Sequence, residues 1–186
     1  MSFNATGFPG LLVFEPNVLS DDRGYFFESY NERVFQKNGV EIKFVQDNQS
    51  HSNYGVLRGL HYQLVPYGQT KLVRVLTGSV LDVVVDIRKQ SPTFAKSYSI
   101  ELSGENKKQL LVPKGFAHGF VVLSPTADVM YKCDAFYNKD SEAGINYKDA
   151  FLGIDWVVPA EKISCSPKDL QLPFFEKCIN NFQFEG

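Results

Sequence analysis

The fold is indicated most clearly by the stretch Ser79-Val80-Leu81-Asp82-Val83-Val84-Val85-Asp86-Ile87-Arg88. One face of this stretch is apolar and carries Leu81, Val83, Val85 and Ile87. The other face is mixed and carries Asp82, Val84, Asp86 and Arg88. A period of two is typical of a β-strand, and the preceding Thr77-Gly78 can form the turn of a hairpin. The sequence therefore predicts a strand over 79–88 that enters from a hairpin turn.

Similar short β-type segments recur between turn residues along most of the chain. We expect strands at 11–14, 24–30, 44–47, 56–63, 71–76, 97–102, 109–112, 119–123 and 129–136. One early helix is expected over 31–38, capped by Asn31 and ended by Gly39, and the sequence allows a short second helix over 173–180. Many short, closely spaced strands predict an all-β fold, an antiparallel jelly roll (double-stranded β-helix) with a few short peripheral helices.

Length and composition are those of an ordinary globular protein. The 186 residues fit a single domain, 1–186, with a peripheral segment from about residue 160. A formal net charge of −2 gives no general attraction to nucleic acid or to an anionic membrane. The N-terminus lacks the pattern of a signal peptide, and no apolar run is long enough to span a membrane. We therefore expect a cytoplasmic protein with neither kind of partner.

Cysteine usage argues against a covalent or metal framework. Cys133, Cys165 and Cys178 are odd in number and widely spaced, and none forms a Cys-x-x-Cys pair. A disulfide scaffold or a zinc ribbon is therefore not expected.

Two islands of polar chemistry interrupt the apolar strands. The first is Val56-Leu57-Arg58-Gly59-Leu60-His61-Tyr62-Gln63, followed by Lys71, and the second is Pro113-Lys114-Gly115-Phe116-Ala117-His118-Gly119-Phe120. Buried unpaired charges and imidazoles are costly, so strand interiors normally exclude them. Two of the chain's three histidines lie in these islands, which indicates a concave polar site.

Three interpretations of His61 and His118 compete. Each can be a satisfied core or surface histidine. Each can be a metal ligand, since Pro113-x-Gly115-x-x-His118 resembles the second motif of the cupin superfamily, whose jelly rolls often hold a metal through three His and a Glu. The matching first motif reads His61-Tyr62-Gln63 and lacks one imidazole, so carboxylates or Gln63 would have to complete such a site.

The third interpretation is acid–base catalysis at carbon. An imidazole is a suitable general base near neutral pH, provided that a carboxylate orients its other nitrogen. A lysine or a second imidazole can stabilise a carbonyl oxygen as it becomes an enolate, and a tyrosine can return the proton. The chain supplies such a set in His61, Lys71, His118 and Tyr131.

The ordered motifs of the chain, from about Phe8 to Pro173, resemble those of the dTDP-4-dehydrorhamnose 3,5-epimerases, a metal-free branch of the cupin-like folds. The motifs are Asp22-Arg23-Gly24-x-Phe26-Phe27-Glu28-Ser29-Tyr30, Phe44-Val45-Gln46-Asp47-Asn48, Leu57-Arg58-Gly59-Leu60-His61, Lys71-Leu72-Val73-Arg74, Asp82-Val83-Val84-Val85-Asp86-Ile87-Arg88, Pro113-x-Gly115-Phe116-Ala117-His118-Gly119-Phe120, Tyr131-Lys132 and Ser164-x-x-x-Lys168-Asp169. Each motif is weak alone, but their order over nearly the whole chain is specific.

The resemblance implies a reaction and a set of catalytic residues. The substrate would be dTDP-4-dehydro-6-deoxy-D-glucose, a nucleotide-linked 4-keto-6-deoxyhexose, converted to dTDP-4-dehydro-L-rhamnose in dTDP-L-rhamnose biosynthesis. It implies His61 as base with Asp169 orienting it, Tyr131 as acid, and Lys71 and His118 at the enolate oxygen. No cofactor is implied, because the ketone of the substrate is the electron sink. Without the resemblance, Ser166-Pro167-Lys168-Asp169 indicates only a turn, and Tyr131 only a packed strand tyrosine.

The resemblance also implies how the nucleotide sugar is bound. The substrate-binding positions would be Arg23, Glu28, Gln46, Asn48, Arg58, Tyr137, Glu142 and Lys168. Guanidinium groups suit a diphosphate, and an aromatic ring such as that of Tyr137 can stack on thymine. The family implies a homodimer that exchanges N-terminal strands, in which Arg23 and Glu28 reach the partner's pocket.

One structural prediction can be tested directly. Strict alternation would put Arg58 and His61 on opposite faces of their strand. If both reach one pocket, the pairing must be interrupted between them, and Gly59 is the expected position of a bulge.

Three other functions stay open at this stage. They are a metal-dependent cupin enzyme, an epimerase acting only at C3 or only at C5, and a catalytically inactive module that binds a sugar nucleotide.

Overall fold

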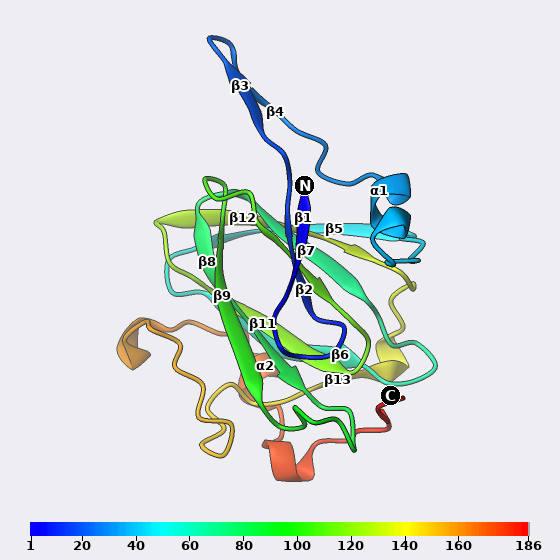
Figure 1. Cartoon of the computed structure of the whole chain (residues 1–186). Coiled ribbons are helices and arrows are strands. Elements are labelled where there is room, and N and C mark those ends of the chain that lie inside the picture. The colour runs from blue at the N-terminus through cyan, green and yellow to red at the C-terminus, as the bar shows by residue number, and fades with distance from the viewer. Residues whose placement is uncertain (186) are drawn as a thin grey trace.

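Two antiparallel sheets packed face to face form the body of the molecule (Figure 1). The computed structural model describes residues 1–185. In the six-stranded sheet the order is β1 (Ser2–Ala5), β2 (Leu12–Glu15), β10 (Gln109–Val112), β7 (Lys71–Thr77), β12 (Thr126–Cys133) and β5 (Gln46–Asn53). In the five-stranded sheet it is β13 (Glu142–Gly144), β6 (Leu57–Gln63), β11 (Phe116–Val122), β8 (Ser79–Asp86) and β9 (Ser97–Ser103). The predicted all-β class is confirmed.

Smaller elements surround this sandwich. A two-stranded hairpin, β3 (Leu19–Asp21) and β4 (Gly24–Phe26), projects away from the body (Figure 1). The helices are α1 (Glu32–Lys37) and α2 (Pro167–Leu170), with short 3₁₀ turns η1 (Lys139–Ser141), η2 (Ala160–Lys162) and η3 (Phe175–Lys177). Within residues 1–185, no helix has the length and apolar character that crossing a membrane requires.

The predicted early helix is confirmed together with its caps. The Asn31 side chain accepts hydrogen bonds from the backbone N–H groups of Arg33 and Val34, as an N-cap does. Gly39 follows the C-cap residue with a φ of +77°, a left-handed conformation that glycine adopts without steric cost.

The hairpin predicted around Thr77-Gly78 is wrong. Strand β7 pairs with β10 and β12 in one sheet, whereas β8 pairs with β11 and β9 in the other. The chain therefore passes from one layer to the other at Gly78, whose φ is +74°. A Cβ atom here would lie against the carbonyl oxygen of Thr126, so this corner requires glycine.

Several predicted boundaries also differ. The strand predicted at 24–30 ends at Phe26, after which the chain turns toward α1. The strand predicted at 44–47 begins instead at Gln46 and continues to Asn53, because β12 pairs with this polar stretch along its whole length. The strands predicted at 119–123 and 129–136 each begin three residues earlier, and the helix allowed over 173–180 is only the turn η3.

The alternation in β8 is confirmed, but both of its faces are buried. Val80 and Val84 enter the apolar core between the two sheets. Val83 and Val85 pack on the outer side, under the C-terminal segment, as does Ile87 just beyond the strand, which ends at Asp86 and not at the predicted residue 88. A third cluster, around Phe14 and Phe35, lies between the six-stranded sheet and α1. The five-stranded sheet is thus packed on both faces.

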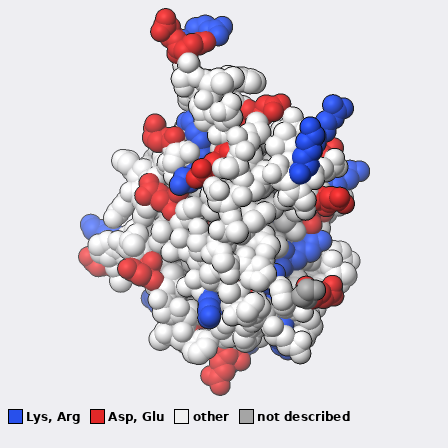
Figure 2. Space-filling view, in the orientation of Figure 1, with Lys and Arg blue, Asp and Glu red and all other residues white. Residues whose placement is uncertain are grey.

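Charged side chains of both signs are mixed on the face shown in Figure 2. They lie mostly around its edge, and the tip of the β3–β4 hairpin carries acidic and basic groups together (Figure 2). The ion pair between Arg23 and Asp21 belongs to this tip.

Candidate active site

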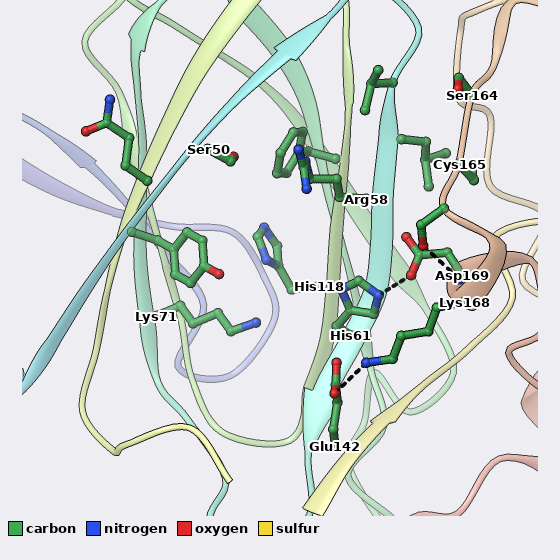
Figure 3. A pocket seen from close by; sticks show the side chains of 16 residues that line it. Ser50, Arg58, His61, Lys71, His118, Glu142, Ser164, Cys165, Lys168 and Asp169 are labelled. Carbon is green, nitrogen blue, oxygen red and sulfur yellow. Dashed lines mark hydrogen bonds and ion pairs between the residues drawn. The ribbon is translucent and has the colours of Figure 1, made fainter. Parts of the chain in front are cut away.

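A cavity of about 500 Å³ lies between the two sheets. Eight of the residues predicted for the site line it: Arg58, His61, Lys71, His118, Tyr131, Glu142, Lys168 and Asp169 (Figure 3). The remaining lining residues are Gln49, Ser50, Val56, Leu57, Phe120, Ser164, Cys165 and Ser166.

A bulge in β6 brings Arg58 and His61 into this cavity together. His61 lies opposite His118 of β11, but Arg58 lies opposite Phe120, so β6 contains one extra residue between the two pairs. Gly59 occupies the bulge with a φ of +134°, and a Cβ atom on it would lie 2.5 Å from the Cα atom of Gly119. The predicted interruption at Gly59 is confirmed.

His61 is paired with a carboxylate that comes from the distant helix α2. Its Nε2 atom lies 2.7 Å from Oδ1 of Asp169, while Oδ2 accepts a weaker bond from the Gly59 N–H at 3.4 Å. Burial alone would raise the pKa of Asp169, but these contacts outweigh it and lower that pKa below its usual value. Asp169 is therefore a carboxylate at neutral pH and can hold the imidazole in one orientation. The other ring nitrogen of His61, Nδ1, lies on the cavity side (Figure 3).

The local peptide around Asp169 is a short helix, where its sequence alone indicated a turn. The Ser166 hydroxyl accepts a hydrogen bond from the Asp169 N–H at 3.1 Å and caps the helix, and Pro167 occupies the first helical position.

His118 has its own buried carboxylate. Its Nε2 atom lies 2.9 Å and 3.0 Å from the two carboxylate oxygens of Asp82 in the neighbouring strand β8. Asp82 is fully buried and was not among the predicted site residues. Its signal in the sequence was a carboxylate between Val80 and Val84 on one strand face, where an unpaired charge would be costly.

Lys71 and Tyr131 come from the opposite wall, in the six-stranded sheet. The Lys71 ammonium lies 5.6 Å from the centre of the Tyr131 ring. Burial lowers the pKa of Lys71, although Cys133, Asp82 and Glu142 oppose this effect. Burial also raises the pKa of Tyr131, so its phenol keeps its proton at neutral pH. A base candidate on one wall therefore faces an acid candidate on the other.

The rim of the cavity is a connected polar cluster. Glu142 accepts hydrogen bonds from Lys168 at 2.5 Å and from the Tyr137 hydroxyl at 2.7 Å. The Tyr137 N–H donates to Gln46, whose side-chain amide donates to Asn48. Gln46, Asn48 and Tyr137 thus adjoin the cavity lining without being part of it.

Arg23 and Glu28 lie outside the cavity of their own chain. Arg23 is at the tip of the projecting hairpin with its side chain 90% exposed, and Glu28 accepts a hydrogen bond from Asn31.

Ser50 is a lining residue that sequence reasoning missed. Its hydroxyl is buried and has no hydrogen-bond partner among residues 1–185. It lies two positions from Asn48 on the same face of β5, which is the signal that could have found it.

Over the described residues, no three His, Cys, Asp or Glu side chains converge as metal ligands do. Within the cavity lining, Nε2 of His61 and Nε2 of His118 each face a carboxylate, and they do so in separate pairs.

The fold is a jelly roll, and a His–Asp pair, a lysine and a tyrosine line one cavity in it. This combination is typical of a cupin-like enzyme that catalyses acid–base chemistry at carbon. The family model described as dTDP-4-dehydrorhamnose 3,5-epimerase matches residues 5–177. This chain belongs to that family.

Individual relatives agree along most of their length. The dTDP-4-dehydrorhamnose 3,5-epimerase of Shigella flexneri is 52% identical over 171 residues, covering 91% of this chain and 93% of the relative. The crystal structure of the enzyme of that name from Elizabethkingia anophelis has a TM-score of 0.90 at 51% identity, covering 95% of this chain and 97% of its own. The 3,5-epimerase of Legionella pneumophila, solved with dTDP-4-keto-L-rhamnose, has a TM-score of 0.91 at 47% identity, with coverages of 95% and 93%.

Proposed function

We propose that this chain inverts C3 and C5 of dTDP-4-dehydro-6-deoxy-D-glucose and so forms dTDP-4-dehydro-L-rhamnose for dTDP-L-rhamnose biosynthesis. The observation that carries the proposal is the His61–Asp169 pair on one wall of a cavity whose other wall presents Lys71 and Tyr131. The Legionella relative, solved with dTDP-4-keto-L-rhamnose, supports this choice of ligand.

His61 acts as the base. The C4 ketone acidifies the hydrogens on C3 and C5, and the neutral imidazole takes one of them through the ring nitrogen on the cavity side. Asp169 accepts the hydrogen bond from Nε2 and stabilises the imidazolium that forms. General-base transfer of this kind contributes roughly 10²–10⁴-fold to the rate.

Removing the proton creates an enolate whose negative oxygen was the C4 carbonyl. Lys71 stabilises that oxygen with its ammonium group, and His118, whose Nε2 atom is held by Asp82, directs its other ring nitrogen to the same oxygen as a second donor. Each such donor is worth roughly 10²–10³-fold. No cofactor is needed in this scheme, because the ketone itself accepts the electron pair.

Tyr131 returns a proton to the opposite face of the carbon. Its phenol stands in the six-stranded sheet, across the cavity from β6, and its raised pKa keeps the proton available. Removal on one face and return on the other inverts the centre. His61 then releases its proton to solvent and Tyr131 regains one, so the same set can act in turn at C3 and C5 and produce the double epimerisation.

The nucleotide part of the substrate is held along the rim. Arg58 and Lys168 bind the diphosphate, with Glu142 setting the position of Lys168. Tyr137 stacks on the thymine ring, and Gln46 and Asn48 supply hydrogen bonds beside it.

We further propose that this single epimerase domain works as a homodimer in which the β3–β4 hairpin and the residues just after it deliver Arg23 and Glu28 to the partner's pocket. The projecting hairpin exposes Leu19, Tyr25 and Phe26 by 60%, 59% and 67%, an apolar surface that a second subunit would cover (Figure 1). Mixing inactive Arg23→Ala with inactive His61→Ala subunits should restore activity, since hybrid dimers contain one intact pocket. A mixture as inactive as its parents would reject the shared site.

We place the reaction in the cytoplasm. The three cysteines of the described chain are free thiols, a state typical of a reducing compartment.

The decisive experiment is NMR of the 4-keto sugar nucleotide with the protein in D₂O. Deuterium at both C3 and C5, with the inverted sugar trapped by a reductase, is the expected result. Exchange at one carbon only would identify a single-centre epimerase, and binding without exchange would identify an inactive module.

A further inference from the structure

The C-terminal tail, Ile179–Phe184, closes the end of the sandwich next to Lys71. It lies beside the loop that joins β6 to β7, the strands that carry His61 and Lys71 (Figure 1). The match to the family model ends at residue 177, so this tail lies outside the matched residues.

Hydrogen bonds attach the tail to the segments of the chain beside it. The Asn181 side chain both accepts from the Val65 N–H and donates to the Val65 carbonyl, each at 3.1 Å. Lys89 donates to the carbonyl of Phe182 and accepts from the N–H of Phe184. The Tyr62 hydroxyl donates to the carbonyl of Ile179 at 2.6 Å. The tail is thus held against the loop after β6 and the loop after β8.

Phe182 is the buried anchor of the tail, with only 6% of its surface exposed. Its ring fills space that two glycines leave open: a Cβ atom on Gly68 would lie 3.0 Å from the ring, and one on Gly115 would lie 3.3 Å away. Phe182 and Lys71 line the same small cavity, of about 10 Å³. That volume is at the lower limit for a single water molecule.

We propose that Phe182 is a positioning residue for Lys71. The ring of Phe182 seals the sandwich behind the lysine and keeps water away from its ammonium group. The inference rests on the proposed function, in which Lys71 stabilises the enolate. An ammonium group acts more strongly on an oxyanion in a dry, low-dielectric cavity than in water. The tail therefore supports catalysis from the side opposite to the substrate.

Several charged or titratable groups face Lys71 and enter any measurement of its titration. They are Cys133 and Tyr131 from β12, Asp82 from β8, Glu142 from β13, His118 from β11, and His61 and Tyr62 from β6. A substitution at Phe182 leaves all of them in place. A changed titration of Lys71 would then report its hydration.

The test is Phe182→Ala in the full chain, with two readouts. We expect kcat to fall about tenfold with KM little changed, since enolate stabilisation is weakened and substrate binding is not. We also expect the pKa of Lys71 to rise toward that of a solvated lysine, read by NMR of ¹³C-labelled lysine and assigned with Lys71→Arg. The alkaline limb of the kcat profile should move to higher pH with it.

Matched variants separate sealing from general loosening. Phe182→Leu keeps an apolar plug and should restore both readouts. Phe184→Ala removes a ring that packs on Arg88, away from the small cavity, and should resemble the wild type. If Phe182→Ala does not fold, Phe182→Val should show the same shifts at smaller size.

A folded Phe182→Ala protein with an unchanged Lys71 titration would overturn the proposal, whatever its kcat. So would an equal shift in Phe184→Ala. The NMR titration requires no turnover, so a wild-type protein without epimerase activity would reject the proposed function and still leave the role of Phe182 measurable.

Discussion

The Nε2 atom of His61 lies 2.7 Å from Oδ1 of Asp169, although 108 residues separate them in the sequence. Asp169 is 4% exposed and also contacts the N–H of Gly59, so the bulge and the carboxylate hold the imidazole together. The orientation of the proposed base therefore depends on both a strand irregularity and a remote helix.

His61→Ala should abolish solvent exchange at both C3 and C5, because one imidazole is proposed to remove both hydrogens. NMR of the substrate in D₂O measures the exchange, and circular dichroism checks that the fold is intact. Deuterium still entering at either carbon would require a second base.

Asp169→Asn should lower kcat by roughly 10²–10⁴-fold, since the amide neither stabilises an imidazolium nor selects the same tautomer. Steady-state kinetics would measure the loss. Lys168→Met is a useful comparison because it alters the neighbouring residue, and it should mainly raise KM. A variant with full kcat would remove Asp169 from the proposed dyad.

Tyr131→Phe should separate exchange from inversion. His61 can still remove and return hydrogens on its own face, so deuterium should enter with the original configuration. The phenol that completes inversion is gone, and we expect inverted product to fall by about 10²-fold or more. Product configuration is read by NMR after reduction, and normal inversion would show that another group is the acid.

Gly59→Ala should destabilise the fold by about 2–5 kcal/mol, because the new Cβ atom meets the Gly119 backbone and the left-handed φ is strained. Activity should be lost as Arg58 and His61 are displaced. Gly7→Ala is the control, since Gly7 also has a positive φ but nothing within 4 Å of its would-be Cβ. Urea unfolding of both variants makes the comparison, and equal losses would argue against the close approach.

Asp86→Asn should cost about 3–5 kcal/mol at neutral pH, because it leaves the buried Arg88 without its charge partner. Burial raises the pKa of Asp86, but hydrogen bonds from Arg88, Ser91 and Thr93 outweigh this and hold that pKa below its usual range. The pKa of Asp86 is thus lower in the folded protein than in the unfolded chain, where it is about 3.9. Ionised Asp86 therefore stabilises the fold above that pH, and this stabilisation is lost as the pH falls through the folded pKa.

The difference in unfolding free energy between wild type and Asp86→Asn should therefore shrink below about pH 4. Denaturant titrations at several pH values test this. Glu161→Gln, at an exposed position, should show no comparable pH dependence. A difference that is constant with pH would mean that packing, and not ionisation, is responsible.

Much of the fold followed from local sequence. Neighbouring residues predict the alternation in 79–88, the capped helix after Asn31 and the many short strands. This is because side-chain directions repeat about every two residues in a strand and about every four in a helix. The need for a bulge at Gly59 could also be derived, since Arg58 and His61 are three positions apart and would point to opposite faces of a regular strand. The C-terminal Asp169 entered only through resemblance to a family.

Tertiary structure alone decided the rest. Gly78 looked like a hairpin turn, but it became a crossing between layers because β7 and β8 found their hydrogen-bond partners in different sheets. The polar stretch 46–53 forms a strand because each of its residues pairs with a residue of β12. Three pairings depend on long-range packing: His118 with Asp82, His61 with Asp169, and the C-terminal tail with the loop between β6 and β7. The sequence by itself determined which groups exist and which face of a strand they share; only the folded chain, by excluding water and closing long loops, decided which of them meet.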